Sequence, residues 1–184
     1  VSRAKDEGRF TIVIGMRAHP EVEAICGWCG EHVLCENAEE TEKWLLDNQA
    51  LWEKPITVVV QTTQTHSNFT ECCDCIKKRC TNVKISDTIC LATFTRQEEA
   101  CKLASACDAM VVIGGKHSAN SVHLAKICSE HCDNVQFIER TEGLDLDKLK
   151  TADTVGLTAG ASTPAWIIKE VRNKMNDEIK VEEM

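Results

Sequence analysis

The sequence has no apolar run long enough to cross a membrane, and its charged first residues, 1–8, are not followed by the apolar segment of a signal peptide. We therefore expect no membrane partner and a cytoplasmic location. The first residue is not Met, and residues 1–8 are similar to the end of a surface helix. From this we expect a fragment of a longer chain.

Blocks of basic residues are also missing, and the formal net charge of the 184 residues is −8. Binding to a nucleic-acid backbone needs clustered Lys and Arg side chains, so we expect no nucleic-acid partner. A small phosphate needs only a few local donors. The acidic balance is therefore compatible with an anion-binding site.

Cysteine, in contrast, is abundant, with 12 residues. Without a secretory signal we expect a reducing compartment, so these cysteines do not predict a disulfide framework. Many of them fall on apolar faces of predicted helices, where a free cysteine behaves as a small buried hydrophobe. Two pairs, Cys26/Cys29 and Cys72/Cys75, have CxxC spacing, but the loop pattern of a zinc ribbon is missing. A structural metal-binding protein stays open as an alternative.

Short strands rich in Val and Ile alternate with helices along the chain. Such strands are typically buried on both faces of a sheet, and the alternation predicts right-handed crossovers and a mainly parallel sheet. We expect an α/β fold with two similar modules, residues 1–87 and 88–176, each a small sheet flanked by helices, and a charged tail over 177–184. Strands are expected near residues 10–14, 32–35, 56–60, 83–86, 89–92, 109–113, 135–138 and 154–157.

Four of these strands run into polar turns rich in small residues, and each turn leads into a helix. The turns cover residues 15–21, 61–66, 114–120 and 158–164. Helix N-termini present unpaired N–H groups and the positive end of the helix dipole, so such turns can bind anions. They match neither a P-loop nor a GxGxxG fingerprint, and Gly, Ser and Asn are also ordinary loop residues. A non-catalytic module that binds a phosphorylated metabolite is one function open at this point.

His19, Glu21 and Cys90 are further candidates for chemistry. His19 and Glu21 lie two residues apart at a predicted helix start, where Glu21 could act as a general acid and His19 as an anion donor. A glutamate favoured by the helix dipole beside a solvated histidine is the simpler interpretation. Cys90 is expected at the start of the strand near 89–92, where it could be a nucleophile or one ligand of a cluster. By spacing alone, core packing is the more frequent role of such a cysteine.

Five segments in one register resemble the 4-hydroxy-3-methylbut-2-enyl diphosphate reductase family, and the similarity extends over residues 2–173. The segments are His19-Pro20-Glu21-Val22, Gln61-Thr62-Thr63, Ile89-Cys90 with Ala92-Thr93 and Arg96-Gln97, Gly115-Lys116-His117-Ser118-Ala119-Asn120, and Thr158-Ala159-Gly160-Ala161-Ser162. The resemblance implies an iron–sulfur oxidoreductase of non-mevalonate isoprenoid biosynthesis. Such an enzyme reductively removes a hydroxyl from an allylic diphosphate and releases isopentenyl and dimethylallyl diphosphates.

The resemblance also implies three modules around a 4Fe-4S cluster with three cysteine ligands, and an electron-donor protein such as ferredoxin or flavodoxin. Cys90 would be one cluster ligand, Glu21 would deliver protons and Thr62 would orient the substrate hydroxyl. The residues implied at the diphosphate are His19, Ser118, Asn120 and Ser162, with Ala119 standing where many members have a second serine.

The family's first module, with two of the three cluster cysteines, would precede Val1. We find no substitutes for them among the other cysteines of the sequence. The resemblance therefore implies that this chain alone does not hold a complete cluster, and that it is inactive or nearly so as a reductase.

Overall fold

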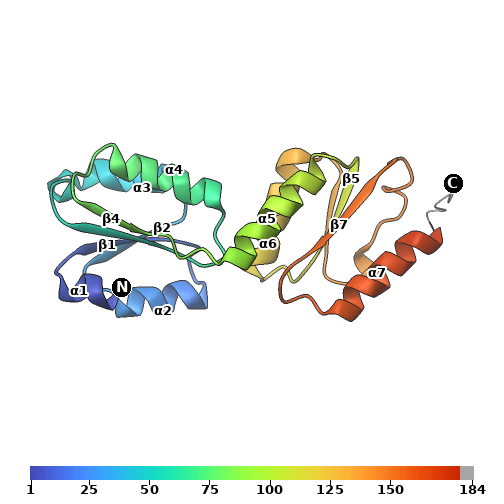
Figure 1. The fold of residues 1–184 in the computed structure, drawn as a ribbon, viewed down its shortest axis with the longest axis horizontal. Helices are drawn as coiled ribbons and strands as arrows, with labels where there is room; N and C mark the ends of the chain where they lie inside the picture. The colour runs from blue at the N-terminus through green and yellow to red at the C-terminus, as the bar shows by residue number, and fades with distance from the viewer. Residues whose placement is uncertain (179–184) are drawn as a thin grey trace. The chain divides into compact units, whose positions relative to one another are not determined.

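The computed structural model of the protein describes residues 1–178 and consists of two compact units, divided between Leu91 and Ala92 (Figure 1). The division expected from the sequence lay between residues 87 and 88. Cys90, assigned from the sequence to the second module, therefore belongs to the first unit. In the charged tail expected over 177–184, the first two residues end the last helix, and the others lie outside the described residues.

The first unit is a four-stranded sheet with helices on both faces (Figure 1). All of its strand pairs are parallel, in the order β2-β1-β3-β4. Its elements are α1 (Ser2–Asp6), β1 (Phe10–Ile14), α2 (Pro20–Trp28), β2 (His32–Cys35), α3 (Ala38–Asp47), the short 3-10 helix η1 (Gln49–Leu51), β3 (Ile56–Val60), α4 (His66–Lys77) and β4 (Val83–Ser86).

The second unit is a three-stranded sheet, also fully parallel, in the order β6-β5-β7. Its elements are α5 (Leu91–Ala104), which begins at the last residue of the first unit, β5 (Ala109–Ile113), α6 (Ala119–His131), β6 (Val135–Ile138), the 3-10 helix η2 (Thr141–Gly143), β7 (Val155–Ala159) and α7 (Ala165–Glu178). Two parallel sheets with flanking helices confirm the predicted α/β fold. None of the helices within residues 1–178 is long and apolar enough to span a membrane.

Alternate residues of β1 point to opposite faces of the first sheet. Ile12 and Ile14 join the core beneath α3 and α4, where Leu45 is fully buried. Val13 joins a second core with Val22 of α2. Figure 1 shows α3 and α4 on one face of this sheet and α1 and α2 on the other. Because both faces are covered, the strand has no solvent-exposed face, which explains the continuous apolar runs of the sequence.

The second unit repeats this arrangement around β5. Val111 and Ile113 pack in a core that includes Val171 of α7. Val112, on the opposite face, packs in a core that includes Leu124 of α6. Each unit therefore has its own hydrophobic cores on the two faces of its own sheet.

The strand predicted near 89–92 is wrong, because helix α5 begins directly after Cys90. The Ile89 N–H donates to the Asp87 carboxylate at 3.0 Å. An aspartate that accepts a hydrogen bond from the backbone N–H two residues ahead turns the chain. That N–H can then no longer bond to a neighbouring strand. Cys90 therefore lies in a loop before α5 and not at a strand start.

Leu45 and Leu46 are neighbours on α3 with opposite exposure, so they form a matched pair for testing the core. Leu45 is fully buried, whereas Leu46 is 47% exposed. Leu45→Ala should lower the free energy of unfolding by about 2–5 kcal/mol, because it leaves a cavity. Leu46→Ala should lower it by less than about 1 kcal/mol. Urea unfolding followed by circular dichroism measures both losses, and equal losses would contradict this packing.

Candidate functional site

Glu21 and Thr62 come together at the edge where the parallel strands of the first unit end. β1 and β3 pair with Ile14 opposite Val60, so the turns that follow them lie side by side. The Thr62 backbone N–H donates to Glu21 Oε1 at 2.9 Å, and the Thr62 hydroxyl donates to Glu21 Oε2 at 3.0 Å. A half-buried carboxylate is thus held at both oxygens by one residue. In this fixed position it can exchange a proton with a bound polar group through the hydroxyl.

His19 is the N-cap of α2, and its ring is oriented by the start of that helix. Its Nδ1 accepts a hydrogen bond from the Glu21 N–H at 3.2 Å. A neutral imidazole that accepts at Nδ1 carries its proton at Nε2. The half-buried His19 therefore presents an N–H donor at Nε2, as the binding of an anion requires.

Cys90 is connected to the Glu21–Thr62 pair through the backbone. Its N–H donates to the Thr62 carbonyl at 3.0 Å. Among the twelve cysteines, all of them within the described residues, only Cys90 is exposed. Burial raises the pKa of the Cys72 and Cys128 thiols to about 11, so both stay protonated near neutral pH. Cys90 is therefore the cysteine most accessible to a ligand.

Gln61 belongs to the same site, although sequence reasoning gave it no role. Its fully buried side chain accepts from the Met16 N–H at 2.9 Å and donates to the Thr63 hydroxyl at 2.9 Å. These bonds link the turn after β1 to the turn after β3. Its position directly after an apolar strand was the signal that could have indicated this role. An amide buried there must form its hydrogen bonds within the protein.

Ser118 and Asn120 lie at the start of α6 in the second unit. The Ser118 hydroxyl oxygen accepts from the Ser121 N–H at 3.4 Å and so caps the helix. Asn120 is 6% exposed, and within the described part of the chain neither Oδ1 nor Nδ2 of its side chain has a hydrogen-bond partner. Buried amides in proteins are almost always bonded, so this side chain is available to a ligand.

The other residues predicted in this unit lie at the same sheet edge. β5 and β7 pair with Ile113 opposite Ala159, so the turns after both strands end together. Ala119 is buried beside Ser118, and Ser162 is exposed in the turn between β7 and α7. The structure therefore brings Ser118, Asn120 and Ser162 to the carboxyl ends of the strands.

The turns after β1 and β5 are built alike. The Arg17 N–H donates to Glu36 Oε1 at 2.5 Å, and the Lys116 N–H donates to Glu139 Oε1 at 2.7 Å. Glu36 follows β2 directly, and Glu139 follows β6 directly. Sequence reasoning missed both glutamates, because each contact joins two turns that meet only when the strands pair.

Gly114 and Gly160 allow the start of α6 to approach the ends of β5 and β7. A Cβ atom added at either glycine would collide with Ser121 Oγ. At Gly114 it would also lie 2.6 Å from Ser121 Cβ, whereas at Gly160 that distance would be 3.3 Å. The absence of a side chain at these two positions therefore fixes how closely the helix start sits on the sheet edge.

A three-cysteine iron–sulfur cluster does not fit the side chains of this chain by themselves. Within residues 1–178 no three His, Cys, Asp or Glu side chains are grouped so that they could hold a metal ion. Cys90 is the position that the resemblance matches to a cluster ligand, and a cluster needs further thiolates. The two CxxC pairs form no such group either, so nothing in the described residues favours a structural metal-binding protein.

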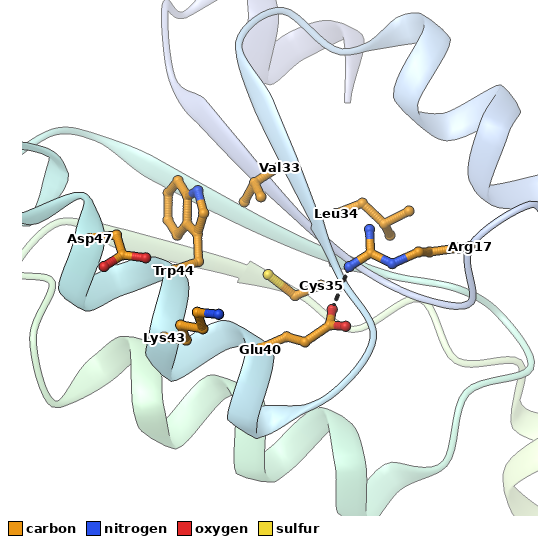
Figure 2. Close-up of a pocket in the computed structure, with 8 residues that line it drawn as sticks. All are labelled: Arg17, Val33, Leu34, Cys35, Glu40, Lys43, Trp44 and Asp47. Atoms are coloured by element: carbon orange, nitrogen blue, oxygen red, sulfur yellow. Dashed lines mark hydrogen bonds and ion pairs between the residues drawn. The ribbon is translucent and has the colours of Figure 1, made fainter.

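A groove beside the edge strand β2 contains none of the predicted site residues (Figure 2). Its walls come from β2 and α3, and Arg17 spans one side by pairing with Glu40 at 2.7 Å. The lining includes two cations, Arg17 and Lys43, and two anions, Glu40 and Asp47. Because these charges balance, the groove has no excess positive charge to attract a diphosphate. The strand ends are the better candidate site.

A family model described as LytB protein matches residues 1–176. Relatives named 4-hydroxy-3-methylbut-2-enyl diphosphate reductase include one from Caldanaerobacter subterraneus subsp. tengcongensis, 37% identical over 169 residues, and one from Clostridioides difficile, 40% identical over 172 residues. The matches cover 92% and 93% of this chain but 57% and 60% of those proteins. The chain thus spans about three fifths of the length of these relatives.

Two solved structures are also similar. One is a structure of (E)-4-hydroxy-3-methyl-but-2-enyl diphosphate reductase, the terminal enzyme of the non-mevalonate pathway. It has a TM-score of 0.54 and 34% identity, over 96% of this chain and 62% of that one. The other is the E-1-hydroxy-2-methyl-but-2-enyl-4-diphosphate reductase from Plasmodium falciparum, with a TM-score of 0.82 and 24% identity, over 96% of this chain and 55% of that one. At this identity the second likeness concerns the fold alone.

The hydrogen bonds between Glu21 and Thr62 predict a non-additive pair of substitutions. Thr62→Val removes the hydroxyl bond, whereas Glu21→Ala removes both bonds to the carboxylate. We expect Thr62→Val to lower the free energy of unfolding by about 1 kcal/mol and Glu21→Ala to lower it by about 2–3 kcal/mol. Thr70→Val, on the exposed side of α4, should cost about 0.5 kcal/mol or less. Urea unfolding of the double variant should match Glu21→Ala alone. A fully additive loss would show that the hydroxyl bond is absent.

The contacts of Ser121 predict that one glycine variant can be rescued and the other cannot. Gly160→Ala should cost about 1–3 kcal/mol, and Ser121→Ala should restore most of it, because the colliding Oγ is then gone. The double variant Gly114→Ala/Ser121→Ala should stay destabilised, because the added Cβ at position 114 still collides with the Cβ of residue 121. Gly27→Ala is the control, since nothing lies within 4 Å of an added Cβ there. Thermal unfolding compares these variants, and equal rescue of both glycine positions would contradict the geometry.

Proposed function

The chain belongs to the LytB protein family, and from this membership we propose that it serves the reductive dehydroxylation of 4-hydroxy-3-methylbut-2-enyl diphosphate. The proposal draws on relatives that carry the name of this reductase. The observation that supports it most is the double hydrogen bond between Glu21 and Thr62, which lie 41 positions apart. Both residues lie in segments that resemble those of the reductase family.

We assign proton delivery to Glu21 and Thr62. The reaction replaces an allylic hydroxyl by hydrogen, consumes two electrons and two protons, and releases water. When Glu21 is protonated, it donates to Thr62 Oγ1, and the Thr62 hydroxyl hydrogen can turn to the substrate oxygen. One proton reaches the hydroxyl as the carbon–oxygen bond breaks, so the hydroxyl leaves as water, and the two electrons and the second proton go to the remaining allylic carbons. The electrons come from a donor protein of the ferredoxin or flavodoxin class, and the products are isopentenyl and dimethylallyl diphosphates.

We assign diphosphate binding to His19, Ser118, Asn120 and Ser162. These side chains offer an imidazole N–H, two hydroxyls and an amide, all of them neutral donors. The starts of α2 and α6 add the positive ends of helix dipoles. Asn120 supports the assignment most, because its buried amide has no partner among the described residues. Ala119 contributes backbone only.

We further propose that the 184-residue chain alone does not turn over the substrate. Cys90 is the single thiol that the resemblance places at the cluster, and no three metal-binding side chains gather within residues 1–178. Diphosphate binding needs none of these thiols. The isolated chain should therefore bind an allylic diphosphate without reducing it.

Calorimetry and an anaerobic turnover assay on the purified 184-residue chain test this proposal. After reconstitution with iron and sulfide, we expect no turnover above the protein-free control. Diphosphate binding should persist without iron and in Cys90→Ala. Asn120→Ala should weaken binding by about tenfold, which is the loss of one hydrogen bond to a charged group. Asn176→Ala, exposed on α7, is the matched control and should leave binding unchanged.

Two results would contradict the assignment. Robust turnover by the isolated chain would refute its inactivity. Unchanged binding in Asn120→Ala would remove Asn120 from the diphosphate site. If a chain completed with the part of its relatives that it does not span also binds the diphosphate without turnover, that result would instead favour a non-catalytic module for phosphorylated metabolites.

A further inference from the structure

Cys26 and Cys29 lie together at the end of α2 in the first unit. The helix ends at Trp28, and Cys29 is already extended, with φ −72° and ψ 160°. The Cys29 N–H donates to the Cys26 carbonyl, three residues earlier, at 3.1 Å. A turn closed by an i to i+3 bond aligns the side chains of its first and last residues. The two thiols therefore lie on the same side of this turn.

Cys72 and Cys75 have the same spacing but a different setting. Both lie inside α4, between His66 and Lys77. On a regular helix, Cβ atoms three residues apart are about 5–6 Å from each other. A disulfide needs Cβ atoms about 3.5–4.5 Å apart, so this pair cannot close without distorting the helix. The Cys26–Cys29 pair lies at the end of α2, where the chain leaves the helix after Trp28, so closing it disturbs fewer helix hydrogen bonds than closing a pair inside α4.

The two thiols at the end of α2 differ in access. Cys26 is half-buried, whereas Cys29 is 8% exposed and donates from its Sγ to the Ile25 carbonyl at 3.3 Å. Trp28 between them is 67% exposed, so the turn itself lies at the surface. A small molecule therefore has better access to Cys26 than to Cys29.

Burial raises the pKa of both thiols, and the neighbouring Cys29 thiol raises that of Cys26 further. The thiolate is the reacting form of a cysteine, so the reactive fraction of each thiol grows as the pH rises toward the pKa of that thiol. Burial is the largest influence on both thiols, so both are protonated in the reduced form near neutral pH.

We propose that Cys26 and Cys29 form a reversible disulfide by exchange with a low-molecular-weight disulfide such as oxidised glutathione. The Cys26 thiolate attacks one sulfur of the glutathione disulfide, forms a mixed disulfide and releases one glutathione thiolate. The Cys29 thiolate then attacks the Cys26 sulfur and releases the second glutathione. Two protein thiols are oxidised and one glutathione disulfide is reduced to two thiols, so the atoms and electrons balance. This modification site is independent of the proposed reductase function.

The test equilibrates the reduced 184-residue chain anaerobically in buffers with a rising ratio of oxidised to reduced glutathione. Free thiols are alkylated rapidly, and mass spectrometry with fragmentation assigns each bond. We expect the Cys26–Cys29 disulfide to form at a ratio of oxidised to reduced glutathione at least about tenfold lower than the ratio at which Cys72 and Cys75 form one. Its rate of formation should rise about tenfold from pH 7 to pH 8, because both thiols are protonated there. Equal oxidation of the two pairs would overturn the proposal.

Single variants separate the two steps. Cys29→Ala should accumulate glutathione on Cys26, because no thiol resolves the mixed disulfide. Cys26→Ala should leave the buried Cys29 unmodified, and Cys75→Ala should not change the titration of the first pair. Absence of glutathione on Cys26 in Cys29→Ala would overturn the assigned order of attack. The wild-type titration remains decisive if a variant does not fold.

Discussion

The parallel pairing of neighbouring strands is the constraint on which the candidate site residues of each unit depend. With Ile14 opposite Val60, the turns after β1 and β3 end at one edge, and the same holds for β5 and β7 in the second unit. Parallel strands present all their carboxyl ends on one side, where α/β proteins bind ligands. Glu21 and Thr62 can therefore share two hydrogen bonds although they are far apart in the sequence.

The two units have different residue types at equivalent positions. His19 and Ser118 are both N-caps, and two residues after each cap stand Glu21 and Asn120. In the first unit this position is a carboxylate already bonded to Thr62, which suits it to proton transfer. In the second it is a buried amide with no partner among residues 1–178, which suits it to binding an oxygen-rich anion. We propose that this equivalent position serves acid chemistry in the first unit and anion binding in the second.

Local patterns predicted the fold well, because burial of strands on both faces leaves a local signature of Val and Ile. The helix starts that follow the turns at 15–21 and 114–120 were predicted from local signals in the same way. Contacts between turns were not predictable, since spacing carries no information on the bond from Thr62 to Glu21. The expected strand at 89–92 shows the limit of apolar content as a signal, because the carboxylate of Asp87 turns the chain there. The proposed roles of the site residues come from the resemblance. The structure adds the hydrogen bonds that these residues make.

Proton delivery by Glu21 is the central claim, and turnover in a completed chain tests it most directly. The chain would be joined to the segment of the Clostridioides difficile relative that it does not span, and assayed anaerobically with a reduced donor. We predict turnover of the allylic diphosphate by the joined chain. In Glu21→Gln we predict a fall of at least about 100-fold with diphosphate affinity unchanged. Turnover in Glu21→Gln close to that of the unsubstituted joined chain would contradict the claim.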